Sequence, residues 1–216
     1  MTRTIVCFGD SNTHGADPSG AGRMSPDVRW PRVMARALGD GYEVIEEGLN
    51  GRCTVFDSPL TAGRNGLDYL EPCLLSHEPV DLVIIMLGTN DLKRIYGLTA
   101  AEIAQGAGRL VDVARRSLAG PAETPPKVLL VSPVPLGEVT ENSEMWGLGD
   151  SRDESKRLAG MYRLVAESQG VGHFDAGSVV QTHPDDGVHL DAAACATLGA
   201  AMANAVAAEF DRVAAP

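Results

Sequence analysis

The feature that most constrains the fold is a pair of apolar segments typical of buried parallel strands. Residues 82–87 read Leu-Val-Ile-Ile-Met-Leu without a polar interruption, and residues 4–8 are β-branched or apolar apart from Cys7. A strand exposed on one face alternates apolar and polar side chains, whereas a strand covered on both faces has no such alternation. Both segments are therefore predicted to lie inside a parallel sheet.

The remaining elements alternate along the chain in a way that favours parallel β-α units. Further strands are predicted over residues 43–48, 127–132 and 171–175. Helices are predicted over residues 31–38, 67–76 with an interruption near Pro72, 99–118, 151–169 and from 192 to about Val213. Thr99 and Glu102 have the spacing of a capping box, so they mark a helix start. This alternation predicts an α/β protein, a three-layer α/β/α sandwich around a mainly parallel five-stranded sheet.

Length and composition narrow the class further. The chain has 216 residues, so one domain over residues 1–216 is the simplest expectation. A net charge of -11 disfavours nucleic acid and anionic membrane surfaces as partners. No apolar segment is expected to be long enough to span a bilayer, and a cytoplasmic location is predicted. The four cysteines are widely spaced, which predicts free thiols and neither a zinc site nor a redox dithiol.

Four short polar stretches follow the predicted strands, and their order is the functional signal. They are Gly9-Asp10-Ser11, Asn50-Gly51, Gly88-Thr89-Asn90-Asp91 and Asp186-Gly187-Val188-His189. The carboxyl ends of parallel strands share one edge of a sheet, where ligands and reacting groups collect. We expect the first three stretches to lie on this edge and the fourth to reach it. A serine at this position suggests a nucleophile, which needs a base and an oxyanion site.

This constellation resembles the SGNH hydrolases, also called the GDSL esterase/lipase family. Their four blocks carry Ser, Gly, Asn and His in that order, which match Ser11, Gly51, Asn90 and His189 here. The resemblance covers essentially the whole chain and is closest to the bacterial arylesterase/acyltransferase branch. It implies the flavodoxin-like SGNH hydrolase fold. One departure is Asn12, which stands where the family usually has Leu.

The resemblance implies a serine esterase that uses neither a metal nor another cofactor. Ser11 would attack an acyl carbonyl, His189 would take its proton, and Asp186 would orient the imidazole. The oxyanion would be met by the backbone N–H groups of Ser11 and Gly51 and by the side-chain amide of Asn90. The substrates implied are short-chain aryl, alkyl or acetyl esters, with acyl transfer to an alcohol or peroxide as a further activity.

Each of these residues also has a purely structural interpretation. Ser11 can cap a turn, Gly51 can serve a turn only, and Asn90 can form an Asx-turn. His189 can be a surface histidine. Asp185 competes with Asp186 for the triad, although only Asp186 has the family's spacing. Asp10 and Asp91 are expected to hold loops together rather than to react.

Substrate preference is the least determined part of the prediction. Carbohydrate acetylesterase, thioesterase and lysophospholipase activities occur in the same family, and the sequence does not separate them. The specificity loops are expected over residues 16–30, 52–66 and 136–150, of which the last is predicted to be irregular. Candidate pocket residues are Asn12, Trp30, Trp146 and Val188. Arg29-Trp30 and Met145-Trp146 fit a subunit interface equally well, and a homo-oligomer is predicted. Glu46-Glu47 and Lys93-Arg94 are expected to be solvated or paired charges.

Overall fold

A computed structural model describes residues 2–138 and 140–212. Within them, one sheet contains five strands in the order β2-β1-β3-β4-β5, and every neighbouring pair is parallel. The strands are β1 (Arg3–Gly9), β2 (Tyr42–Gly48), β3 (Leu82–Met86), β4 (Lys127–Ser132) and β5 (Gly172–Asp175). The predicted three-layer α/β class and the predicted strands are confirmed, with boundaries shifted by one or two residues.

The register brings the carboxyl ends of the central strands together. Gly9 at the end of β1 pairs with Gly48 of β2 on one side and with Met86 of β3 on the other. The turns after these three strands therefore leave the sheet at neighbouring points of one edge. Residues that are distant in sequence meet there because parallel strands must all run in the same direction.

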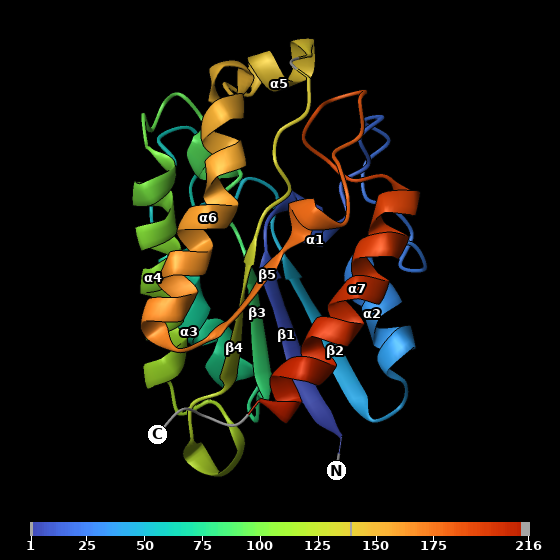
Figure 1. Ribbon diagram of the computed structural model, residues 1–216, viewed down its shortest axis with the longest axis vertical. Coiled ribbons are helices and arrows are strands. Elements are labelled where there is room, and N and C mark those ends of the chain that lie inside the picture. Colours follow the sequence, from blue (N-terminus) through green and yellow to red (C-terminus); the bar gives the residue numbers. More distant parts are fainter. Residues whose placement is uncertain (1, 139, 213–216) are drawn as a thin grey trace.

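Helices cover both faces of the sheet (Figure 1). One face carries α3 (Gly66–Ser76), α4 (Ala100–Arg116) and α6 (Arg152–Gln169), and the other carries α2 (Trp30–Leu38) and α7 (Ala192–Asp211). Side chains of β3 alternate between the two cores, with Val83 and Ile85 on the first face and Leu82 and Ile84 on the second. All four are fully buried. Each such side chain contributes about 1.5–3 kcal/mol, which explains why β3 carries no polar residue.

Helix α7 corrects one expectation. Its length and its mean hydropathy of 1.3 over the most apolar window are sufficient for a membrane span by composition alone, so the expectation that no segment would meet that test was wrong. Cys195, Leu198, Met202 and Val206 of this helix are fully buried in the core between the sheet and α2. This packing gives the apolar composition of α7 a structural reason, because the core helix of a globular protein has the same composition.

Four local details confirm, extend or correct the prediction. The segment expected to be irregular contains α5 (Glu141–Met145) and a short 3-10 helix, η3 (Gly149–Ser151). Helix α3 continues through Pro72 because buried neighbours such as Leu70 and Leu74 hold it against the sheet. The capping box of Thr99 and Glu102 is present at the start of α4. The described part of α7 ends at Asp211, and Val213 lies outside the described residues.

Candidate active site

Ser11 begins a four-residue helix, α1 (Ser11–His14), immediately after β1. Asp10 caps this helix by accepting a hydrogen bond from the backbone N–H of Asn12 (3.0 Å). The turn is tight, since a Cβ on Gly9 would clash with Oγ1 of Thr13. Ser11 therefore sits at the carboxyl edge of the sheet with only 7% of its surface exposed.

A chain of short hydrogen bonds joins Ser11, His189 and Asp186. Nε2 of His189 lies 2.9 Å from Oγ of Ser11, and Nδ1 of the same ring lies 2.6 Å from Oδ2 of Asp186. A neutral imidazole that donates from Nδ1 has Nε2 free to accept the Ser11 hydroxyl proton. Burial alone would raise the pKa of Asp186, but hydrogen bonds from the His189 ring and from two backbone amides outweigh it and lower that pKa. Asp186 therefore stays ionised although only 1% of its surface is exposed.

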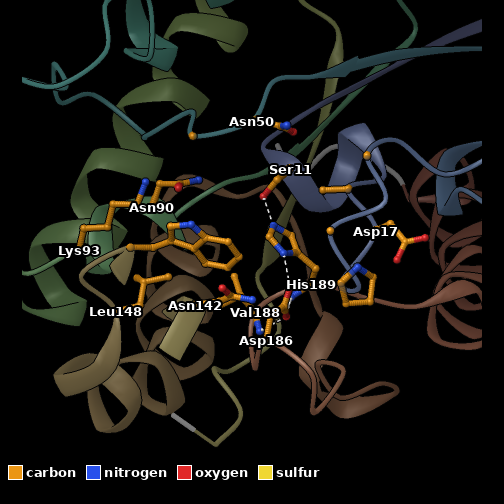
Figure 2. A pocket seen from close by; sticks show the side chains of 16 residues that line it. Ser11, Asp17, Asn50, Asn90, Lys93, Asn142, Leu148, Asp186, Val188 and His189 are labelled. Atoms are coloured by element: carbon orange, nitrogen blue, oxygen red, sulfur yellow. Dashed lines mark hydrogen bonds and ion pairs between the residues drawn. The ribbon is translucent and has the colours of Figure 1, made fainter. Parts of the chain in front are cut away.

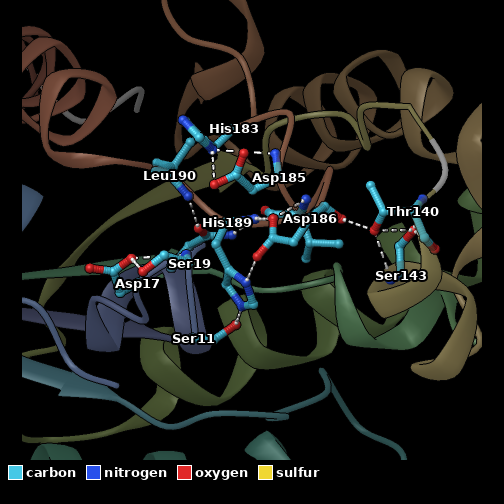
Figure 3. Close-up of polar contacts among 12 residues, drawn as sticks. Ser11, Asp17, Ser19, Thr140, Ser143, His183, Asp185, Asp186, His189 and Leu190 are labelled. Carbon is cyan, nitrogen blue, oxygen red and sulfur yellow. Dashed lines mark hydrogen bonds and ion pairs between the residues drawn. The ribbon is translucent and has the colours of Figure 1, made fainter. Parts of the chain in front are cut away.

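The loop that carries His189 is held by contacts on several sides (Figure 3). Oδ1 of Asp186 accepts the backbone N–H groups of Val188 and His189, both at 2.8 Å. Thr140 donates its hydroxyl to the carbonyl of Asp186 (3.2 Å). Asn12 uses both ends of its amide, donating to the carbonyl of Val188 (3.2 Å) and accepting from the N–H of Leu190 (3.1 Å). These bonds fix the imidazole relative to α1.

Asn90 and Gly51 lie on the other side of Ser11. Asn90 begins a 3-10 helix, η1 (Asn90–Leu92), and donates one N–H of its amide to the carbonyl of Arg52 (3.1 Å). The second N–H of that amide has no protein partner among the described residues and is available to a ligand. Gly51 has a φ of +79°, which favours glycine over residues with a side chain. Both residues line the same cavity as Ser11.

Arg52 and Asp91 lock these two turns together. Oδ1 of Asp91 accepts from the N–H of Thr54 (2.9 Å), and its carboxylate also binds the Thr54 hydroxyl. The guanidinium of Arg52 stacks on Phe8 and donates to the carbonyls of Gly9 (3.0 Å) and Glu47. Burial raises the pKa of Asp91 to about 6, despite the hydrogen bonds from Thr54. Asp91 thus has the structural role expected of it.

The cavity in front of Ser11 has a volume of about 410 Å³, which suits a small ester. Figure 2 shows Ser11 and His189 at its centre, with Asn90 and Lys93 on one side and Asp17 on the other. Trp146 packs edge-on against the His189 ring, with ring centroids 5.4 Å apart. The lining includes Trp146 and Val188, as the sequence suggested. Residues 16–22 and 142–148 contribute to it, whereas no described residue of 52–66 does.

The prediction that Trp30 and Asn12 line the pocket is wrong. Trp30 is 1% exposed and packs with Met34 in the core between α2, α7 and the sheet, because both side chains lie on the inner face of α2. It therefore lines neither a pocket nor an exposed interface. Asn12 is not in the cavity wall, since its amide is used to hold residues 188–190. Lys93, expected to be a solvated or paired charge, lines the cavity instead; its position three residues after Asn90 was the available signal.

The remaining charged residues that were singled out have structural partners. Glu46 forms ion pairs with Arg29 (3.2 Å) and Arg32 (2.9 Å). Arg94 forms one with Asp150 (3.1 Å). Asp185 points to His183 (3.5 Å) rather than to His189, so it does not compete with Asp186 for the imidazole.

One group of side chains could hold a metal ion, although the cysteine spacing gave no sign of it. Ligand atoms of Glu47, Cys73 and His77 lie within 4.8 Å of one another on the α3 side of β2. Glu47 already pairs with Nε2 of His77 at 2.9 Å. Burial and the nearby Glu47 raise the pKa of the Cys73 thiol to about 12, which opposes the thiolate that a metal requires. These contacts account for the cluster as a link between α3 and β2.

Comparisons with known proteins point to one enzyme family. The model of the GDSL-like Lipase/Acylhydrolase family matches residues 7–196. An aryl esterase of M. smegmatis has 42% identity and a TM-score of 0.92, with 96% of this chain and 100% of that chain covered. Est24, a carbohydrate acetylesterase from Sinorhizobium meliloti, has 42% identity and a TM-score of 0.91, with 96% of this chain and 99% of that chain covered. These similarities support a serine esterase.

A more distant curated relative points in the same direction. An acetylxylan esterase of Xylanibacter ruminicola is 25% identical over 201 residues. The aligned region includes 86% of this chain but spans only 39% of that protein's length.

Proposed function

The chain belongs to the GDSL-like lipase/acylhydrolase family, and we propose that it is a serine esterase that cleaves short-chain carboxylic esters through an acyl-enzyme on Ser11. The observation that carries this proposal is the hydrogen-bonded series from Ser11 Oγ to His189 (2.9 Å) and from His189 to Asp186 (2.6 Å). The resemblance to SGNH hydrolases predicted from the sequence is confirmed by the family match.

In the first half-reaction, Oγ of Ser11 attacks the acyl carbonyl while Nε2 of His189 takes the hydroxyl proton. The ionised Asp186 stabilises the imidazolium that forms. When the tetrahedral adduct collapses, the imidazolium gives its proton to the departing alcohol oxygen. In the second half-reaction, water attacks the acyl-Ser11 ester, His189 takes the proton of that water, and Ser11 regains a proton as the acid leaves.

The tetrahedral oxyanion is held by the backbone N–H groups of Ser11 and Gly51 and by the second N–H of the Asn90 amide. The bonds of Arg52 to Asn90 and Gly9 support this role, because they fix the turns that carry these donors. Donors that are fixed in advance need no reorganisation when the negative charge appears, which is why they lower the barrier.

The variant Ser11→Ala tests the proposal. We expect loss of para-nitrophenyl acetate turnover and of covalent labelling by an organophosphate, with an unchanged circular dichroism spectrum. Ser19→Ala is a matched control, because Ser19 is an exposed serine whose side chain hydrogen-bonds Asp17 and no other residue in the described part of the chain. Turnover in Ser11→Ala at the wild-type rate would remove Ser11 from the mechanism.

Acetyl esters of carbohydrates are a second substrate class. Their support comes from the names of the carbohydrate acetylesterase Est24 and the acetylxylan esterase. A panel of acetylated sugars and aryl acetates, compared by kcat/KM, separates the two classes. Acyl transfer is tested with the same acyl donors by measuring the ratio of ester to acid product as an added alcohol is increased; acid alone at every alcohol concentration would count against transfer.

The proposal also includes one domain over residues 1–216, a cytoplasmic location and a homo-oligomer. The exposed Met145 and Trp146 support an interface at α5, because Met and Trp are enriched where subunits meet. Light scattering of wild type and Met145→Asp measures this directly: a lower mass in the variant supports the interface, and an unchanged mass contradicts it.

A further inference from the structure

The cavity has opposite charges at its two ends. Apart from Asp186 and His189, its only charged lining residues among those the structure describes are Lys93 and Asp17. Figure 2 shows Lys93 beside Asn90 and Asp17 beyond His189, on opposite sides of Ser11. An ester bound at Ser11 therefore has a cationic side chain near one end and an anionic one near the other.

Lys93 has no carboxylate partner within ion-pair distance in the described part of the chain. The adjacent Arg94 pairs with Asp150, and Asp91 faces Thr54 in the interior. The thiol of Cys53 is close enough to interact with the Lys93 charge, but burial and the nearby Asp91 raise its pKa to about 12. That thiol is thus neutral near pH 7 and supplies no counter-charge. The ammonium group at this wall is available to an anionic ligand.

The opposite end is held negative. Oδ1 of Asp17 accepts hydrogen bonds from the backbone N–H (2.9 Å) and the hydroxyl (2.6 Å) of Ser19. These two bonds lower the pKa of Asp17, so its carboxylate is ionised near pH 7. An anionic group on a substrate would be repelled from this end and attracted to Lys93 at the other.

The net charge of the whole molecule bears on what the Lys93 cation can do. A net charge of -11 repels anionic molecules at long range, so a random surface lysine would do little to hold one. Inside a cavity, a cation and an anion interact more strongly than at an open surface, because less water screens them. The Lys93 cation on the cavity wall beside Asn90 is therefore positioned to select among esters rather than to attract them from solution.

Resting on the proposed esterase function, we propose that the cavity prefers esters that carry a carboxylate within reach of Lys93, and that Lys93 is a specificity-determining residue. The carboxylate can belong to the acyl part, as in half-esters of dicarboxylic acids, or to the alcohol part, as in acetyl esters of hydroxy acids. In either position it pairs with the Lys93 ammonium while the ester carbonyl lies at Ser11.

The experiment compares kcat/KM for two matched pairs of esters, after subtraction of the spontaneous rate. The acyl pair is para-nitrophenyl hydrogen succinate and its methyl ester. The alcohol pair is para-acetoxybenzoate and its methyl ester. The variants are Lys93→Gln, which removes the charge, Lys93→Arg, which keeps it, and Arg94→Gln, which removes the adjacent charge outside the cavity.

We expect wild type to favour the charged member of at least one pair, and Lys93→Gln to lower that preference about tenfold. Lys93→Arg should retain the preference and Arg94→Gln should leave it unchanged. Raising the ionic strength to about 1 M, where the screening length is about 3 Å, should reduce the preference in every protein that keeps a cation at position 93, and should not change the ratio in Lys93→Gln. The pair that responds identifies the end of the ester that faces Lys93.

Equal charged-to-neutral ratios in wild type and Lys93→Gln, for both pairs, would overturn the inference. If wild type cleaves the neutral esters and Ser11→Ala does not, that result leaves the proposed function intact. If wild type and Ser11→Ala are equally inactive on every ester, including para-nitrophenyl acetate, both proposals fail together. The two failures are therefore distinguishable.

Discussion

The floor and the outer wall of the cavity are built in different ways. The floor consists of Ser11, Asn90 and the turns at residues 50–51 and 186–189, and its reacting side chains are at most 9% exposed and are hydrogen-bonded. The outer wall is formed by residues from 16–22 and 142–148, and its Trp146 is 38% exposed. The floor follows from strand ends, whereas the outer wall comes from loops and the short helix α5.

This difference separates the reaction from the choice of substrate. A buried polar group without a partner is destabilising, so each side chain of the floor depends on its neighbours and tolerates little change. Exposed side chains of the outer wall have few partners and can change at little cost in stability. Substitutions in the floor should therefore reduce kcat for every ester, whereas substitutions in the outer wall should change the ranking of esters.

The largest effect is expected for Asp186→Asn in the floor. The amide cannot stabilise the imidazolium and favours the wrong tautomer of His189, so kcat should fall by about 10⁴. Asp185→Asn is the matched control, because Asp185 faces His183 and not His189. Steady-state kinetics with para-nitrophenyl acetate measures both variants. A similar loss in the two variants would show that the general charge of the loop matters, rather than the contact of Asp186 with the ring.

Asn90→Ala should have the next largest effect. Removing one oxyanion donor typically lowers kcat about 10²–10³-fold, with a smaller change in KM. Asn50→Ala is the control, since Asn50 lines the same cavity and its amide has no proposed role in the reaction. A transition-state analogue that forms a tetrahedral adduct on Ser11 should lose affinity in Asn90→Ala only. An equal loss in both variants would contradict the assignment of Asn90 to the oxyanion site.

The stability of the floor should depend on pH through Asp91. Its pKa rises from 3.8 to about 6 on burial, so the folded state binds the proton more tightly than the unfolded state. The stability from this proton is fully present below pH 3.8 and is lost as pH rises through about 6. At about 1.36 kcal/mol per pKa unit, the loss is on the order of 3 kcal/mol.

Urea unfolding near pH 4 and near pH 7 tests this dependence. Asp91→Asn does not titrate, so its free energy of unfolding should improve relative to wild type as pH rises across that window. Asp40→Asn, at an exposed aspartate, should keep a constant difference from wild type. A constant difference for Asp91→Asn as well would show that Asp91 has no raised pKa.

The smallest effect is expected for Trp146→Ala in the outer wall. The indole covers one edge of the His189 ring but is partly exposed, so kcat/KM should change only about threefold to tenfold, by different factors for acetyl and longer acyl esters. Met145→Ala is the control, because Met145 is 84% exposed and is not among the cavity-lining residues, so its kcat/KM should stay within about twofold of wild type. An equal loss of kcat/KM for all esters in Trp146→Ala would show that Trp146 supports the reaction itself rather than the choice of ester.

The sequence alone was sufficient to predict the sheet, because burial on both faces leaves an unbroken apolar pattern such as residues 82–87. It also predicted which polar blocks would meet, since parallel strands bring their ends to one edge. It misplaced Trp30, because a Trp in a loop-rich region has the same local pattern whether it faces a core or a cavity. The fold placed this side chain between α2, α7 and the sheet.

Contacts between distant residues were decided only by the tertiary structure. The bonds of Asn12 to residues 188 and 190 join positions that no local pattern relates. The place of Lys93 on the cavity wall depends likewise on a distant segment, because Trp146 and Leu148 line the same cavity and the backbone N–H of Arg94 donates to the carbonyl of Gly147. Local sequence determines which residues become buried, because burial leaves a periodic signal. Only the packed structure determines which polar groups they meet there, because hydrogen bonds across the fold leave none.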